Sequence, residues 1–312
     1  MPSYVAPLQA SWSRTQRMLF RPFRFEFWLT LGFAAFLSEG LTHSGGGGGG
    51  GGGHNFGWHE RGAAFREGMR HVASFLLHPV WGVLIVCFLG LFAIALLVFM
   101  WLSSRGKFIF LDDVLHERAA IVAPWKQFAR EGNSLFVFWL VLSIASILAV
   151  VGVSLPLIPA VLNAAATGEG WPLVIGIVVS WWATAMVPLV LVIAYTHLFL
   201  FQFVVPIMYR ERIGVMVAWS RFLALFRAHV WSFLAYGVFY LVLLIGFAIA
   251  AGIVGFSTCC VGFIVMGLPY IGAVVLLPAH VLFRGLGPEF LAQFGPEWAV
   301  ETASSGKEKA GV

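Results

Sequence analysis

Charged residues are scarce in this chain of 312 residues: Asp, Glu, Lys and Arg make up 11% of it, against about a quarter of an ordinary soluble protein. None at all lies between Val230 and Phe283. A transmembrane helix needs about 20 apolar residues to cross about 30 Å of hydrocarbon, and this stretch is long enough for two. The scarcity of charge excludes an ordinary soluble globular protein and predicts an all-α integral membrane protein.

Cysteine is also scarce, with three residues in the chain, Cys87, Cys259 and Cys260. No CxxC pair or Cys/His ligand spacing occurs, so the sequence supports neither a zinc site nor a disulfide framework. A bridge between the adjacent Cys259 and Cys260 would be strained, which favours two free or lipid-facing thiols. The first apolar run lacks a small-residue cleavage site, so we expect no cleavable signal peptide. We predict no cofactor.

What the chain does have is long apolar runs, and they predict about six transmembrane helices near residues 25–41, 79–103, 134–163, 172–210, 230–255 and 261–283. The first run is short and contains Glu26 and Glu39, so a re-entrant or interfacial helix is its alternative. The fourth run is uncharged for 38 residues, or about 57 Å as a helix. It contains no polar turn, and we therefore predict one long helix, bent near Pro188, rather than two crossings.

Three segments make up the predicted organisation. Residues 1–24 mix arginines with aromatic residues, which is typical of a segment lying among lipid headgroups. Residues 25–290 form the six-helix membrane domain, and residues 291–312 form a polar C-terminal tail. The extracytoplasmic loop 43–70 includes nine consecutive glycines, and such a tract is expected to be disordered because it has no side chains to bury.

The distribution of basic residues predicts the orientation in the membrane. Sixteen of the 19 Lys and Arg residues fall on one side of the predicted spans, and the remaining three lie within residues 61–70. Because cytoplasmic loops are enriched in Lys and Arg, we expect both termini in the cytoplasm of a bacterial cell and the chain in the inner membrane. The net charge of +5 then reflects this topology and does not indicate nucleic-acid binding.

Two cytoplasmic segments resemble each other and suggest an internal repeat. Each has Glu followed by Arg, then Trp seven positions and Phe ten positions after the Arg: Arg118, Trp125 and Phe128 in one, Arg212, Trp219 and Phe222 in the other. Trp and Phe three positions apart share one face of a helix. We predict two amphipathic helices on the cytoplasmic leaflet, each leading into a transmembrane hairpin. The N-terminal segment is a degraded third copy in this scheme.

Four stretches carry a resemblance to known families: residues 21–29, 104–112, 132–136 and 290–297. They resemble an uncharacterised family of bacterial and archaeal multi-pass membrane proteins. The stretch 205–222 is also similar to the membrane domain fused to some glycerophosphodiester phosphodiesterases, although the catalytic barrel of those enzymes is absent here. The resemblance implies a bilayer-interacting or accessory protein and names no reaction.

The most chemical-looking stretch contains Asp112, Asp113, His116 and Glu117. On a helix, Asp112 and His116 are four apart, as are Asp113 and Glu117, so these pairs are candidate ligands for a divalent cation. The alternative is the solvated first turn of an interfacial helix, where acidic residues suit the helix dipole. Other candidates are histidines: His43, His54 and His59 beside the glycine tract, and His197 and His280 within predicted spans.

The leading hypothesis is a non-catalytic membrane protein, a scaffold or accessory subunit that binds lipids through the two amphipathic segments. Membrane-protein partners or a second copy of the chain are further expected partners. Its motivation is the basic, aromatic repeat together with an absence of charge from spans 2 to 6. One alternative is a transporter or channel for an uncharged or lipid-like solute, with polar contacts from Asn163, Thr184, His197 and Gln202. A metal-dependent enzyme built on Asp112 and its neighbours is the other.

Overall fold

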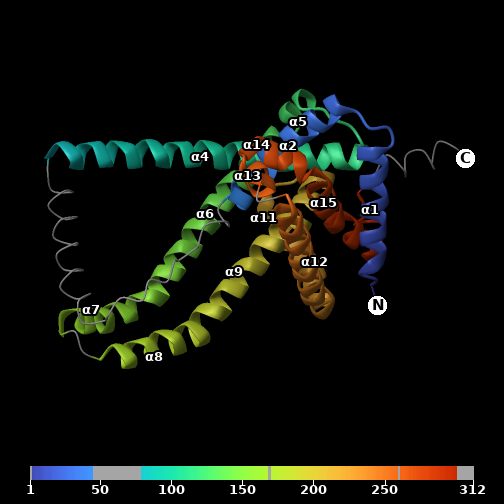
Figure 1. Ribbon diagram of the computed structural model, residues 1–312. Helices are drawn as coiled ribbons and strands as arrows, with labels where there is room; N and C mark the ends of the chain where they lie inside the picture. Colours follow the sequence, from blue (N-terminus) through green and yellow to red (C-terminus); the bar gives the residue numbers. More distant parts are fainter. Residues whose placement is uncertain (1, 45–78, 168–169, 259–260, 301–312) are drawn as a thin grey trace, which may run out of the picture. The chain divides into compact units, whose positions relative to one another are not determined.

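The computed structural model describes residues 2–44, 79–167, 170–258 and 261–300. These residues form helices and no strand, which confirms the predicted all-α class. The glycine tract and the last twelve residues of the predicted tail, 301–312, lie outside the described residues. In chain order the elements are α1 (Val5–Phe20), α2 (Phe25–Ser44), α4 (Pro79–His116), α5 (Val122–Gln127), α6 (Ala129–Ser154), η1 (Leu155–Leu157), α7 (Ile158–Thr167), α8 (Trp171–Trp181), η2 (Trp182–Met186), α9 (Val187–Phe199), η3 (Leu200–Val204), α10 (Val205–Glu211), α11 (Val215–Ala228), α12 (Val230–Ser257), α13 (Val261–Gly267), α14 (Pro269–Val275), α15 (Leu277–Leu291) and η4 (Ala292–Phe294) (Figure 1).

Within the described residues, four helical stretches are long and apolar enough to cross a membrane: Trp81–His116, Ala129–Ala164, Pro172–Glu211 and Val230–Ser257. A fifth crossing is available if α14 and the helix that follows it, which meet at a bend of 70°, are counted as one broken span. The structure thus has four or five candidate transmembrane helices, and the six that the sequence predicts are not confirmed.

The predicted first and last spans account for the difference. The first corresponds to α2, which is helical but is not among the candidate spans, and its apolar residues Leu31, Ala34 and Ala35 are fully buried within the protein. The last is divided among α13, α14 and α15. Proline disfavours a helical conformation in the residue before it, and Leu268, which precedes Pro269, has the extended angles φ −72° and ψ 126°.

The predicted long helix near 172–210 is confirmed as one candidate span of 40 residues, Pro172–Glu211. It contains two π-helical segments, η2 and η3. The first directly precedes Pro188, where the sequence predicts a bend. A π-helical segment changes the hydrogen-bond pattern of a helix without ending it, and such segments are frequent at functional sites.

The chain divides into two compact units. One contains Gly48–Phe99 and Leu140–Ala194, so its described residues come from α4, the segments from α6 to η2, and α9. Large apolar side chains such as Leu84, Phe88 and Leu148 are exposed along these helices. Apolar patches of this extent are rare on soluble proteins, and they suit a hydrocarbon environment.

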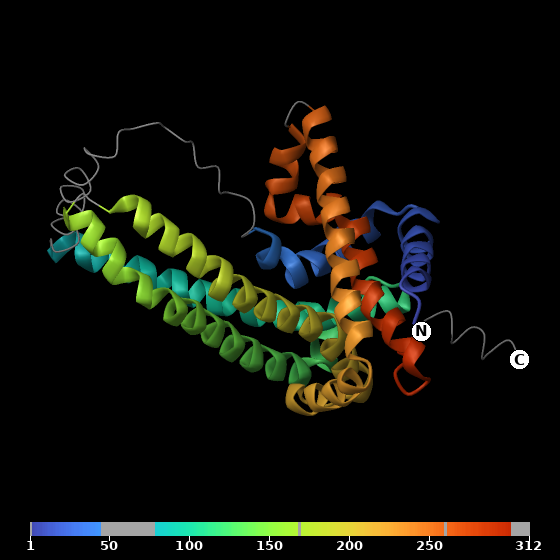
Figure 2. The same ribbon diagram turned by 90° about the horizontal axis from the view of Figure 1, so that it is seen from below.

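The other unit contains Met1–Gly47, Met100–Trp139 and Tyr195–Val312. In it α1 packs along α15, α2 packs along α14, and α13 lies against α12 (Figures 1 and 2). One hydrophobic cluster joins α1, α2, α4 and α15, with Leu19, Leu31, Ile109 and Leu277 fully buried. This unit also contains the buried polar groups described below.

Aromatic residues form a second cluster in the same unit. It surrounds Phe203, whose ring stacks on Phe222 with centroids 5.4 Å apart and meets Phe233 edge-on at 5.1 Å. Tyr236 and Phe290 complete it, with ring centroids 4.6 Å apart. Contacts of this kind add about 0.5–1.5 kcal/mol each to the burial of the rings themselves, so η3, α11, α12 and α15 are held together mainly by aromatic packing.

Candidate functional site

The acidic pair Asp112 and Asp113 lies near the C-terminal end of α4, because this helix continues to His116. The alternative that the sequence leaves open, a solvated first turn of an interfacial helix, is wrong for both residues. The helix continues because its last turns are buried on all sides: Phe108, Ile109, Phe110 and the other apolar residues up to Leu115 are fully covered. A helix C-terminus disfavours negative charge, so the two carboxylates depend on local partners.

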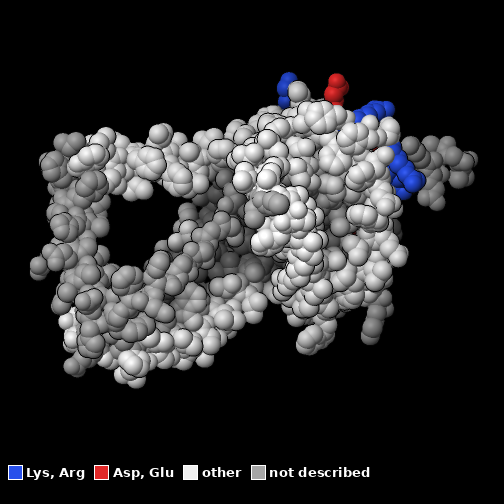
Figure 3. Space-filling view, viewed as in Figure 1, with Lys and Arg blue, Asp and Glu red and all other residues white. Residues whose placement is uncertain are grey.

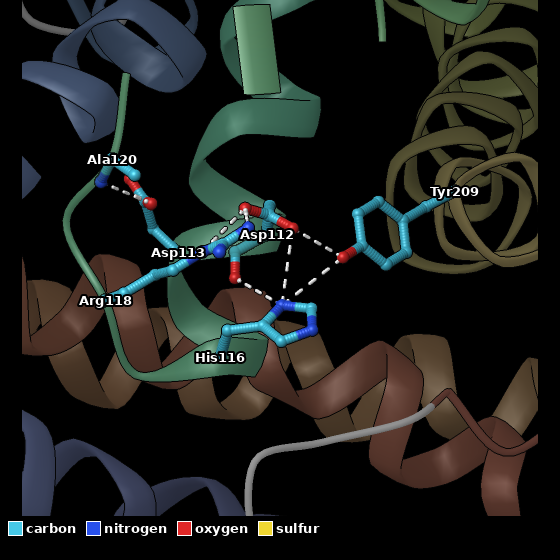
Figure 4. Close-up of polar contacts among 6 residues, drawn as sticks. All are labelled: Asp112, Asp113, His116, Arg118, Ala120 and Tyr209. Carbon is cyan, nitrogen blue, oxygen red and sulfur yellow. Dashed lines mark hydrogen bonds and ion pairs between the residues drawn. The ribbon is translucent and has the colours of Figure 1, made fainter. Parts of the chain in front are cut away.

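Asp112 finds those partners on two other segments (Figure 4). Its Oδ2 atom accepts hydrogen bonds from Arg118, at 2.7 Å from Nη2 and 3.2 Å from Nε. Its Oδ1 atom accepts a hydrogen bond of 2.6 Å from the hydroxyl of Tyr209 on α10. The hydrogen bond and the negative charge of Asp112 raise the pKa of the Arg118 guanidinium. Asp112 thereby joins the end of α4, the loop that follows it and α10.

His116 belongs to the same group (Figure 4). Its Nδ1 atom lies 3.1 Å from the backbone oxygen of Asp112, 3.3 Å from Oδ1 of the same residue and 3.4 Å from the Tyr209 hydroxyl. The imidazole is partly exposed, whereas Asp112 is almost completely buried. The network is therefore accessible from outside at His116 and Arg118 and partly at Tyr209, whereas Asp112 itself is covered.

Asp113 is fully buried, and no ion pair joins it to a Lys or Arg of the described residues. Its Oδ1 atom accepts a hydrogen bond of 2.9 Å from the backbone N–H of Ala120, which fixes the loop after α4. Its Oδ2 atom has no hydrogen-bond partner among the described residues. Glu117, the fourth predicted ligand, has a positive φ of 51° and lies 3.5 Å from Arg17 of α1.

These contacts hold Asp112 and His116 together but direct Asp113 and Glu117 to other partners. In the part of the chain that the structure describes, no group of three or more His, Cys, Asp or Glu side chains is arranged to hold a metal ion. What the arrangement can do is mechanical: charge-assisted hydrogen bonds are roughly twice as strong as neutral ones, and here they join three segments that are distant in sequence.

The predicted lipid-binding residues of the first repeat segment are partly internal. Phe128 is buried between other groups, stacked on Tyr209 at 4.8 Å and on Phe108 at 5.8 Å. Trp125 is half-buried and meets Trp101 edge-on, with ring centroids 5.9 Å apart. Phe128 therefore does not face lipid, which corrects the expectation for that residue, whereas Arg118 and Trp125 keep exposed surface.

The second repeat segment shows the same division. Phe222 on α11 is fully buried in the aromatic cluster, so the expectation that it faces lipid is also wrong. Trp219 is half-buried, and its ring stacks on Phe222 with centroids 5.5 Å apart. Arg212 has its guanidinium 3.9 Å from the Phe128 ring and donates a hydrogen bond of 2.9 Å to the backbone oxygen of Gln127. The two segments thus contact each other through Arg212 and Phe128.

A second polar centre, which the sequence analysis misses, lies in the same unit and contains Lys107 of α4 and Arg284 of α15. Both side chains are almost completely buried. Lys107 Nζ donates a hydrogen bond of 2.7 Å to the backbone oxygen of Ser38 and lies 3.8 Å from Glu39. Arg284 donates hydrogen bonds to the backbone oxygens of Lys107, at 2.7 Å, and Phe201, at 3.2 Å. The sequence analysis finds no charge within spans 2 to 6, and these two buried cations lie just beyond the predicted ends of spans 2 and 6.

Polar side chains from two more elements surround this centre. Gln202 of η3 is buried, donates a hydrogen bond to the Phe283 backbone oxygen at 3.3 Å and accepts one from the Tyr236 hydroxyl at 3.4 Å. The Tyr240 side chain also hydrogen-bonds to Gln202.

The local sequence does contain a signal that Lys107 is buried. Lys107 stands directly before the run Phe108 to Leu111, which has no polar face to point it toward water.

The remaining candidates from the sequence do not extend either centre. Asn163 and Thr184 belong to the other compact unit, and the Thr184 hydroxyl donates to the Ser180 backbone oxygen of its own helical stretch. His197 lies 6.0 Å from Phe201, centroid to centroid. His54 and His59 lie outside the described residues, as does the side chain of His43.

Taken together, the fold and the two centres define an integral-membrane type of protein: all-helical, with four or five helices able to cross a membrane, and with buried charged groups in one compact unit. The chain belongs to a family of unknown function, DUF7544, which matches residues 3–295. No curated protein and no solved structure matches the chain, and no similarity to glycerophosphodiester phosphodiesterases is shown.

Proposed function

We propose that this protein is a non-catalytic membrane scaffold or accessory subunit that binds anionic lipid through an exposed basic and aromatic surface. The observation that carries the proposal is the turn between α1 and α2. Three arginines and three phenylalanines are exposed within nine residues there: Arg17, Phe20, Arg21, Phe23, Arg24 and Phe25. We call this set the Arg–Phe turn.

Packing holds the Arg–Phe turn in shape. Trp28 donates a hydrogen bond of 2.9 Å from its indole N–H to the backbone oxygen of Leu19. Its ring contacts Phe20 and Phe23 at centroid distances of 5.8 and 5.5 Å. The phenylalanine rings nevertheless keep half or more of their surface exposed. Exposed aromatic residues next to basic residues are typical of helices that lie at a membrane surface.

The distribution of charged side chains on one face of the protein supports a membrane-surface role for the Arg–Phe turn. Figure 3 shows a face that is almost entirely uncharged, and its few visible Lys and Arg side chains lie over the region of α1, α2 and α5. Basic residues in the region of α1, α2 and α5 suit the headgroups of anionic lipids, which attract each nearby Lys or Arg by about 1 kcal/mol.

The buried network around Asp112 favours a structural role of the protein over a catalytic one. Both oxygens of Asp112 accept hydrogen bonds within the protein, and Arg118 and Tyr209 donate them. A catalytic carboxylate has to reach a substrate, whereas this one is committed to joining α4 and α10. We propose that Arg118, Trp125, Arg212 and Trp219, whose side chains are not fully buried, add to the lipid- or partner-facing surface.

The topology is part of the proposal. With both termini in the cytoplasm of a bacterial inner membrane, the Arg–Phe turn and the two repeat segments would all meet the anionic cytoplasmic leaflet. Single cysteines and an impermeant thiol reagent test this on intact cells. A cysteine at Gly49 should be labelled from outside, and cysteines at Ser13 and Ser305 should not. Labelling at Ser305 would reverse the orientation, and labelling at Ser13 alone would leave an odd number of crossings.

Lipid selectivity tests the proposal directly. The full chain is purified from a defined mixture of phosphatidylglycerol and phosphatidylcholine, and the retained lipids are quantified. Replacing Arg21 and Arg24 by Gln removes two basic groups, about 2 kcal/mol of attraction, so the preference for phosphatidylglycerol at this turn should fall roughly thirtyfold.

The matched control replaces the same two arginines by Lys, which keeps the charge and should keep the preference. Replacing Phe20 and Phe23 by Ser should weaken retention of both lipids alike, since ring insertion does not depend on headgroup charge. If the Gln and Lys variants retain the two lipids in the same ratio, the Arg–Phe turn is not a lipid site.

A further inference from the structure

The centre around Lys107 and Arg284 has more positive than negative charge. Both cationic side chains are almost completely buried, and Glu39, at 3.8 Å from Lys107 Nζ, is the carboxylate that faces them. Buried charges are costly unless they are paired and hydrogen-bonded. Two cations and one carboxylate leave one positive charge without a partner of opposite sign among the residues that the structure describes.

Other carboxylates of the described residues do not supply it: Glu26 and Glu297 are exposed, and the remaining ones have partners elsewhere. Asp112 pairs with Arg118, Glu131 with Arg212, Glu211 with Arg221 and Glu289 with Arg14. Asp113 accepts from the Ala120 backbone, and Glu117 lies beside Arg17. Among the described residues, the excess positive charge therefore belongs to this centre.

One donor at the centre is also without an acceptor. The two terminal nitrogens of Arg284 donate to the backbone oxygens of Lys107 and Phe201, but its Nε is buried and has no hydrogen-bond partner among the described residues. A buried N–H that is left unpaired costs about 1–3 kcal/mol. A negatively charged hydrogen-bond acceptor would therefore both balance the excess positive charge of this centre and pair with the Arg284 Nε.

We propose that the Lys107–Arg284 centre binds one phosphate-type oxyanion, either the phosphodiester of a phospholipid headgroup or free inorganic phosphate. Arginine and lysine are the usual partners of phosphate oxygens. The Tyr240 hydroxyl, which hydrogen-bonds to Gln202, is a further polar group beside the centre, whereas the Tyr236 hydroxyl already donates to Gln202. The site is distinct from the Arg–Phe turn and does not depend on it.

Access to the centre is at Glu39. Its side chain retains 24% exposure, whereas that of Lys107 has none. The carboxylate is thus both the internal counter-charge of Lys107 and the group that an arriving anion meets first. It competes with the anion for the same cations, so removing its charge should strengthen anion binding.

Ligand-induced stabilisation of the purified full chain in uncharged detergent tests the proposal. The thermal midpoint is followed with inorganic phosphate at constant ionic strength, with dioctanoyl phosphatidylglycerol and with dioctanoyl phosphatidylcholine. Saturable stabilisation by phosphate identifies the free ion as ligand. Stabilisation by phosphatidylglycerol without phosphate identifies a lipid headgroup. No stabilisation by either anionic probe, or equal stabilisation by phosphatidylcholine, overturns the proposal.

Three variants make the test specific to this centre. Glu39→Gln should lower the apparent Kd for the active probe by about tenfold or more. The repulsion between an anion and a unit negative charge a few ångströms away, at an effective dielectric constant near 20, is larger than the free energy of a tenfold change in Kd. Glu26→Gln, an exposed residue of the same helix, should leave the Kd unchanged. Arg284→Lys, which keeps the charge but lacks the Nε donor, should raise it.

Because Glu39→Gln is expected to improve binding, a folding defect cannot imitate its result. An unchanged or higher Kd in Glu39→Gln would refute the site. Replacing Arg21 and Arg24 by Gln should not move the Kd here, so the outcome is independent of the lipid test on the Arg–Phe turn.

Discussion

Asp112 and Asp113 are neighbours in α4 with opposite electrostatic surroundings, and replacing each by Asn should change stability in opposite directions. Asp112 accepts hydrogen bonds from Arg118 and Tyr209. Asp113 accepts one from the Ala120 backbone, and its second oxygen is buried without a partner among the described residues. Asn has nearly the shape of Asp, so the substitution changes charge rather than volume.

The magnitudes follow from those contacts. A hydrogen bond to a charged group contributes about 1.5–3 kcal/mol, and solvent weakens this one because the Arg118 side chain is 48% exposed. Asp112→Asn should therefore lower the free energy of unfolding by about 1–2 kcal/mol. Asp113→Asn keeps an acceptor for Ala120 and removes a buried carboxylate without a cationic partner, so it should raise the free energy of unfolding by up to about 2 kcal/mol.

The assay is reversible unfolding of the purified full chain in mixed micelles of increasing SDS fraction, followed by circular dichroism. A double-mutant cycle assigns the cause: Asp112→Asn and Arg118→Gln should couple by about 1 kcal/mol, and Asp113→Asn with Arg118→Gln by less. Equal destabilisation by the two Asn variants, or no coupling between Asp112 and Arg118, would refute this account of the network.

Two further pairs of substitutions compare buried with exposed positions by the same unfolding assay. Phe222→Ala should lower the free energy of unfolding by about 3–5 kcal/mol because the ring is fully buried. Met216→Ala, on the exposed face of α11, should change it by no more than about 0.5 kcal/mol. Similar losses in the two variants would mean that α11 does not pack as described. Gly106→Ala should cost about 1–3 kcal/mol, since an added Cβ would lie 2.8 Å from the Leu37 backbone carbon. Gly90→Ala should be neutral or stabilising, because nothing lies within 4 Å, and a loss at Gly90 as large as at Gly106 would contradict this packing.

Apolar composition predicts the helical class and most of the candidate spans, because a run without charge has few structural options. The stretch from Pro172 to Glu211 is an example, since it has no polar turn at which to reverse and is one candidate span. The first and last predicted spans differ from the structure because apolar residues either face lipid or pack inside the protein. Leu31 and Ala34 are as apolar as a lipid-facing residue, but they pack inside the protein, and composition does not separate the two uses.

The aromatic residues of the repeat segments show the same limit. Their spacing correctly indicates that Trp219 and Phe222 lie close together on α11, where the two rings stack. In the other segment, Phe128 lies just past the end of α5, which contains Trp125. The spacing does not indicate that Phe128 and Phe222 point inward, because inward and outward faces are distinguished by the neighbouring elements. The neighbour of Phe128 is Tyr209, 81 residues later in the sequence. The neighbour of Phe222 is Phe203, 19 residues earlier.

Lys107 shows why the buried charges escape a sequence analysis. A charged residue beside an apolar run marks the end of a transmembrane span in the usual interpretation, since a lone charge in hydrocarbon is costly. Here α4 continues past Lys107 because the protein itself supplies the compensation: the Ser38 backbone oxygen, Glu39 and the face of the Phe201 ring at 4.1 Å. These groups come from α2 and η3, about 70 residues before and 90 after Lys107 in sequence. A centre that draws compensation from such distant elements is built only when the chain folds, and its remaining positive charge is the reason to look for an anion there.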